Sequence, residues 1–128
     1  MPNLEELGLG RNPIGDLGVA ALAAPLRKHQ SLTRVYLWGC EMGDEGAASL
    51  IKGLGMDDFK RLQSLDLDRN HLTDKICAPI VEAIYSGAMP KLVEALVSEN
   101  DVSAEAREAV QEALDATAPN GFARSYYD

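Results

Sequence analysis

The chain has 128 residues, of which 46% are hydrophobic and 25% charged, and this balance is that of one folded domain rather than of a disordered segment. The net charge of −8 argues against binding to nucleic acid or to an anionic membrane surface, because both need clustered lysine and arginine. Apolar runs stay far below the ~18 residues that span a bilayer, so we expect no membrane span.

The first predicted element is a short strand, and its pattern returns three times along the chain. The four matching segments are residues 4–12, 32–40, 62–70 and 92–100. Each reads L-x-x-L-x-L-x-x-N/C, with only aliphatic replacements at the leucine positions. Alternate residues of a strand point to the same side, so Leu7, Leu9 and their equivalents are expected to face the core. The closing Asn, or Cys40 in the second segment, is expected to bond backbone groups that the turn leaves unpaired.

A helix is predicted after each strand, because the apolar spacing changes from two residues to about 3.6. The predicted buried faces are Gly18, Ala21, Leu22, Ala24 and Leu26 in the first helix, Gly46, Ala47, Leu50 and Leu54 in the second, and Ala106, Ala109, Val110, Ala113 and Leu114 in the last. The small residues Gly18 and Gly46 are expected to let each helix approach its strand closely.

Acidic or hydroxyl side chains stand near the predicted helix starts, where they are favourable. They are Asp16, Asp44, Asp74 and Ser103. Pro79 departs from the pattern of the other units. If it lies beyond the first turn of the third helix, we expect that helix to kink or to start late.

One strand–helix unit cannot bury its own apolar face, whereas stacked units can. The pattern therefore predicts an α/β solenoid, a right-handed β-α superhelix of four repeats with a parallel concave sheet and convex helices. The repeats start near residues 4, 32, 62 and 92. Their length, the Asn/Cys variation and the stretches GDLGVA at 15–20 and GDEGAA at 43–48 resemble the ribonuclease-inhibitor-like subfamily of leucine-rich repeat proteins. This resemblance implies protein recognition.

The predicted repeat domain covers residues 1–116, and residues 117–128 form a C-terminal tail or cap. The aromatic residues Phe122, Tyr126 and Tyr127 either fold over the last unit or belong to a frayed end. No polar capping unit precedes the first repeat, so we expect either a monomer or a piece of a longer array.

Residues beside the inward-facing leucines are expected to face the concave side. Tyr36 and Trp38 are two apart, so both project from one strand face, and such aromatic residues commonly anchor interfaces. Asp66 and Asp68 add an acidic patch on the next strand, which suits a basic partner loop. The predicted partner-binding site comprises Arg34, Tyr36, Trp38, Asp66, Asp68, Arg69 and Glu94.

Other motifs are better explained by the repeat. The stretch Asp66-x-Asp68-x-Asn70 imitates the start of a calcium loop, but His71 and Cys77 stand where that loop needs Gly and Glu. The cysteines and histidines do not show zinc spacing, so we expect no metal and no cofactor. Two cysteines also make no disulfide framework, and together with the absence of a secretion-signal pattern they favour a cytoplasmic location.

The sequence therefore predicts a non-enzymatic protein–protein interaction module that binds a protein partner on its concave face. One alternative is a regulatory protein resembling the activator of the Ran GTPase. Another is a structural piece of a larger NOD-like-receptor-type array.

Overall fold

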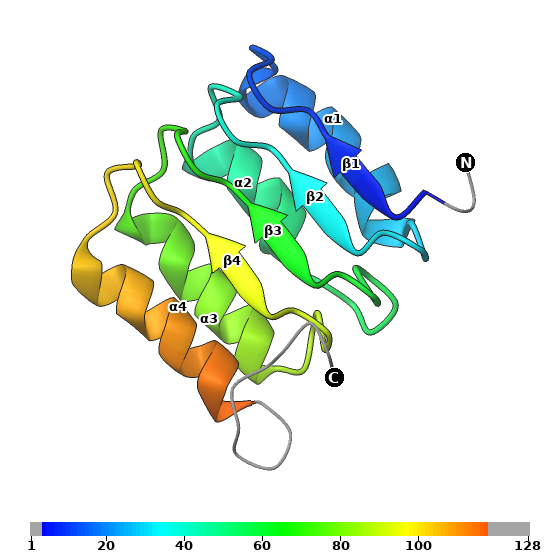
Figure 1. The fold of residues 1–128 in the computed structure, drawn as a ribbon, viewed down its shortest axis with the longest axis vertical. Helices are drawn as coiled ribbons and strands as arrows, with labels where there is room; N and C mark the ends of the chain where they lie inside the picture. Colours follow the sequence, from blue (N-terminus) through cyan, green and yellow to red (C-terminus); the bar gives the residue numbers. More distant parts are fainter. Residues whose placement is uncertain (1–3, 118–128) are drawn as a thin grey trace.

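Four strand–helix units wind into one solenoid in the computed structural model, which describes residues 4–117 (Figure 1). The strands are β1 (Glu6–Gly8), β2 (Arg34–Tyr36), β3 (Ser64–Asp66) and β4 (Glu94–Leu96). The helices are α1 (Gly15–Lys28), α2 (Asp44–Ile51), α3 (Cys77–Tyr85) and α4 (Ala104–Ala116), and a 3₁₀ turn, η1 (Asp74–Ile76), leads into α3. The predicted α/β solenoid is confirmed. The predicted tail or cap at 117–128 lies outside the described residues, apart from Thr117.

The strands form one parallel sheet in the order β1-β2-β3-β4. Each strand pairs with the equivalent residues of the next, so that Leu7 lies beside Val35, Val35 beside Leu65 and Leu65 beside Ala95. The helices lie together behind the sheet, and no helix of residues 4–117 covers its other face (Figure 1). This register aligns equivalent side chains in rows across the sheet, inward rows toward the helices and outward rows toward the uncovered face.

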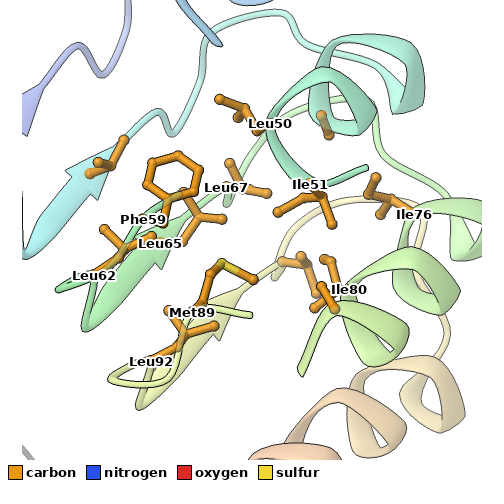
Figure 2. Packing of buried hydrophobic residues seen from close by; sticks show 14 of the residues in the cluster. Leu50, Ile51, Phe59, Leu62, Leu65, Leu67, Ile76, Ile80, Met89 and Leu92 are labelled. Carbon is orange, nitrogen blue, oxygen red and sulfur yellow. The ribbon is translucent and has the colours of Figure 1, made fainter. Parts of the chain in front are cut away.

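The core is built from the predicted aliphatic columns. Leu37 and Leu67 are fully buried and Val97 is 3% exposed, whereas Leu9 in the first unit is half-buried. Figure 2 shows Leu65 of β3, Leu67 just after it and Phe59 directed into the same interior as residues of α2 and α3. The units therefore shield one another from water, as the repeat predicts.

A ladder of asparagine side chains connects the turns that follow the strands. Nδ2 of Asn70 donates to the carbonyl oxygens of Leu37, Leu67 and Asp68 at 2.9–3.2 Å. Its Oδ1 accepts from the backbone N–H groups of Cys40 and Met42 at 2.9 and 3.0 Å. Asn100 makes the equivalent contacts one repeat later, and the Cys40 thiol donates to the Leu9 carbonyl at 3.2 Å. The predicted role of this column is confirmed.

The aspartates near the helix starts bond the next repeat rather than their own helix. Oδ1 of Asp16 accepts from the N–H groups of Gly43 and Gly46, at the start of α2. Asp44 bonds Thr73 in the same way, and Asp74 bonds Ser103. Each carboxylate thus satisfies backbone donors that begin the neighbouring unit, which ties consecutive repeats together.

Three predicted helix faces need correction. Leu54, predicted on the second helix, lies beyond the end of α2 at Ile51. Ala21 and Ala24 in α1 and Ala109 in α4 are exposed. The buried positions are Val19, Ala23 and Leu26 in α1, and Val110, Ala113 and Leu114 in α4. Alanine favours helices on either face because it loses no side-chain entropy, so it marks a buried face poorly.

The expected kink or late start depended on Pro79 lying beyond the first turn of the third helix, and this condition is not met. The turn η1 precedes α3, and Pro79 then lies in the first turn of α3, where its missing N–H removes no intrahelical bond.

The close approach at Gly46 is between two helices, which corrects the predicted approach of helix to strand. A Cβ atom on Gly46 would lie 2.5 Å from Oδ1 and 3.0 Å from Cα of Asp16, at the start of α1. At Gly18 the neighbour would be the side chain of Ile14, 2.4 Å away.

Replacing Gly46 with alanine is expected to lower the free energy of unfolding by about 2 kcal/mol, because the backbone of Asp16 must move to make room. Urea denaturation measures the change. Gly55→Ala is the matched control, since a Cβ there meets only Oδ2 of Asp58 at 3.8 Å. Equal effects of the two substitutions would show that Gly46 is not a point of close contact.

Candidate functional site

Three rows of side chains cross the uncovered face of the sheet, and the strand pairing aligns the first two. The first row is Glu6, Arg34, Ser64 and Glu94. The second row is Gly8, Tyr36, Asp66 and Leu96. The equivalent positions just after the strands are Gly10, Trp38, Asp68 and Ser98. The predicted pairs Tyr36–Trp38 and Asp66–Asp68 therefore lie side by side, each at the end of one strand and in the turn after it.

The two aromatic side chains lean toward β1. A Cβ atom on Gly10 would lie 2.4 Å from the indole ring of Trp38, and one on Gly8 would lie 3.9 Å from the ring of Tyr36. The guanidinium carbon of Arg11 lies 5.4 Å from the Trp38 ring centroid, a cation–π contact. Trp38 is half-buried, so its ring remains on the surface. The absence of side chains at Gly8 and Gly10 leaves the space that these rings occupy.

Tyr36 also contacts the first row. Its hydroxyl donates to Oε1 of Glu6 at 3.4 Å. Burial raises the pKa of the Tyr36 hydroxyl, and the charge of Glu6 raises it further. Tyr36 is therefore a neutral hydrogen-bond donor at physiological pH.

The two aspartates are held by backbone N–H groups. Oδ1 of Asp68 accepts from the N–H of Ser98 at 2.6 Å, and Oδ1 of Asp66 accepts from the N–H of Asp68 at 3.0 Å. Burial raises the pKa of the Asp68 carboxyl, the hydrogen bond from the Ser98 N–H lowers it, and the charge of Asp66 raises it. The pair is thus a concentrated negative charge on a half-buried surface.

The remaining predicted residues lie around these four. Arg34 is 3.6 Å from Glu6, and Ser64 donates to Glu94 at 2.8 Å, so the first row is linked across strands. Arg69 lies in the turn after β3, with a left-handed φ of 57°, and forms an ion pair with Glu99. No ion pair to Asp66 or Asp68 occurs among residues 4–117.

Sequence reasoning missed Arg11 as a member of this surface. It occupies the same repeat position as Arg69 and Glu99, which also have positive φ. The shared repeat position could have placed Arg11 in the turn beside this surface. Its contact with Trp38 depends on the orientation of the indole ring, which the repeat pattern does not give.

Residues 4–117 hold no group of three or more His, Cys, Asp or Glu side chains placed to bind a metal ion. Within the same range, every helix is too short or too polar to cross a bilayer.

A protein-family model described as leucine-rich repeat matches residues 1–23, 28–50 and 62–81, which is more than half of the chain. The chain belongs to the leucine-rich repeat family. This agrees with the asparagine ladder and the parallel sheet described above.

Curated relatives share parts of this leucine-rich repeat chain. The human "NACHT, LRR and PYD domains-containing protein 3" is 40% identical over 75 residues, covering 59% of the chain and 7% of the relative. The bovine "Tonsoku-like protein" is 33% identical over 94 residues, covering 72% of the chain and 7% of the relative. The chain therefore spans only a small part of the length of these relatives.

Solved structures share the leucine-rich repeat fold. The actin-binding site 2 of leiomodin-1 superposes with a TM-score of 0.69 at 18% identity, covering 89% of this chain and 65% of that one. The C-terminal domain of tropomodulin from Caenorhabditis elegans gives 0.64 at 17% identity, covering 91% and 85%. At this identity the comparison establishes the fold alone.

Proposed function

We propose that the concave face binds a basic segment of a protein partner, with Tyr36, Trp38, Asp66 and Asp68 at the centre of the contact. The observation that carries this proposal is the alignment of the aromatic pair with the carboxylate pair, along β2, β3 and the turns that follow them. All four side chains are half-buried on the face that no helix of residues 4–117 covers. Arg34, Arg69 and Glu94 lie at the margin and adjust charge around the centre.

The geometry favours binding over catalysis. The side chains at the proposed centre are held by rigid backbone, so little conformational entropy is lost when a partner binds. Neither histidine belongs to the outward rows, and a nucleophile activated by a neighbouring base is not among the proposed contacts. Membership of the leucine-rich repeat family agrees with a non-enzymatic module.

The proposed location is the cytoplasm. Cys40 and Cys77 are both free and buried, which suits a reducing compartment.

Capture of partner proteins on the immobilised chain tests the proposal. A variant with Tyr36→Ala and Trp38→Ala is expected to lose at least tenfold in affinity for a captured partner, because central aromatic residues carry most interface energy. Tyr85→Ala is the matched control, since that aromatic side chain is 57% exposed on the helical side. Unchanged binding by the folded double variant would refute the concave site.

A second proposed role is as part of a longer array, and the first unit favours it. Leu4, Leu7 and Leu9 are half-buried although their equivalents in the second unit are fully buried, and Leu17 on α1 is 89% exposed. Such an apolar end suits stacking against another repeat.

Two measurements test this second role. Adding a preceding repeat should raise the melting temperature, because it covers the apolar end. Replacing the exposed Leu17 with serine in the isolated chain should reduce aggregation.

A further inference from the structure

We propose that Asp66 and Asp68 together bind a single arginine side chain of the partner. This inference rests on the proposed function and adds the chemical group that the centre of the site recognises.

The carboxylates form one site rather than two. Asp66 turns along its own strand to accept the N–H of Asp68, while Asp68 is fixed by the N–H of Ser98 on the neighbouring repeat. Both groups are therefore positioned before a ligand arrives. A guanidinium group has several donors in one plane and can bond two neighbouring carboxylates at once, which a compact ammonium group does less well.

The surroundings fit the rest of an arginine side chain. Asp66 lies in register between Tyr36 and Leu96, so an apolar side chain stands on each side of the carboxylate. The methylene stem of an arginine can lie along these two residues while its head reaches the aspartates. In the third row, Trp38 occupies the position next to Asp68, one repeat earlier. Its ring already makes a cation–π contact with the guanidinium of Arg11.

The negative charges of Asp66 and Asp68 favour a cation supplied by the partner. The ion pairs among residues 4–117 use the nearby Arg69 on Glu99 and place Arg34 against Glu6. Desolvation and the charge of Asp66 both disfavour the ionised form of Asp68. A guanidinium in contact with both carboxylates relieves that repulsion.

Short peptides test the inference, and Trp38 is a built-in reporter because it is the only tryptophan of the chain. The probes are three peptides that differ in one side chain: arginine, its neutral isostere citrulline, and lysine, each flanked by glycine and serine. Titration followed by Trp38 fluorescence is expected to show the arginine peptide binding at least tenfold more tightly than the citrulline peptide, as for hydrogen bonds to charged groups. Equal affinities for arginine and citrulline, or for arginine and lysine, would overturn the assignment of a guanidinium site.

Substitutions in the protein complete the test. Asp66→Asn and Asp68→Asn keep the oxygen that accepts each backbone N–H, so both variants should fold. Each is expected to weaken arginine-peptide binding by about tenfold, whereas Asp101→Asn, an exposed carboxylate beyond β4, should not change it. Unchanged binding in both variants overturns the inference.

The captured protein partner separates this inference from the proposed function. Partner binding that depends on Tyr36 and Trp38 but not on Asp66 or Asp68 would retain the concave site and reject the arginine. Binding that depends on none of the four residues would reject both.

Discussion

Replacing Asn70 with alanine is expected to lower the free energy of unfolding by about 4 kcal/mol, because the change leaves two buried N–H groups and several carbonyls without partners. Asn70 is 7% exposed and bonds the turns of two successive repeats through both side-chain atoms. Water cannot easily replace these bonds in the core. Urea denaturation followed by circular dichroism measures the loss.

Asn12→Ala is the matched control for this experiment. Asn12 occupies the same repeat position but is exposed. Among residues 4–117 its side chain donates only within its own turn, to the carbonyls of Leu9 and Gly10. Its loss is expected to cost about 1 kcal/mol or less. Similar losses for the two variants would contradict a ladder whose strength comes from burial and from links between repeats.

The fold was predictable because its information recurs every 28–30 residues. Leu37, Leu67 and Val97 repeat the same environment, so one strand pattern defines the whole sheet. The inward alternation of strands is strict, whereas a helix face tolerates alanine on either side, which explains the errors at Ala21, Ala24 and Ala109.

The sequence could predict which residues belong to the candidate site but not how their side chains contact one another. Outward residues follow from the strand period, so Tyr36, Trp38, Asp66 and Asp68 could be placed on one face. The lean of Trp38 toward Gly10 and Arg11, and the turn of Asp66 toward Asp68, depend on side-chain rotamers that a repeat pattern does not encode.

A second structural link lies outside the repeat columns. Arg27, near the end of α1, donates to the carbonyls of Ser49, Lys52 and Gly53, which cap the C-terminal end of α2. Its guanidinium also contacts Oδ2 of Asp58 at 2.9 Å. The two partners are 31 residues apart and belong to no shared repeat position, so the sequence offers no signal for their contact. Asp16 and Arg27 thus connect α1 to both ends of α2.

Replacing Asp58 with asparagine is expected to lower the free energy of unfolding by about 3 kcal/mol at pH 7, because the largely buried Arg27 loses its counter-charge. The side chains of Asp58 and Arg27 are 4% and 18% exposed. Lys28 also lies 2.7 Å from Oδ1, but its side chain is 71% exposed and contributes little. Thermal or urea unfolding of both proteins gives the difference.

The contact between Asp58 and Arg27 also makes the free energy of unfolding depend on pH. The N–H of Gly55, followed by Lys28 and Arg27, holds the pKa of the Asp58 carboxyl well below its usual range. A carboxyl whose pKa is lower in the folded state stabilises fully above its unfolded pKa of about 4, and this stabilisation is lost as the pH falls further. The difference between the native protein and Asp58→Asn should therefore shrink by about 1 kcal/mol per pH unit below pH ~4. Asp57→Asn removes an exposed neighbouring charge and should leave stability nearly unchanged throughout. A difference for Asp58→Asn that stays constant from pH 7 to pH ~3 would show that the carboxylate charge does not stabilise this link.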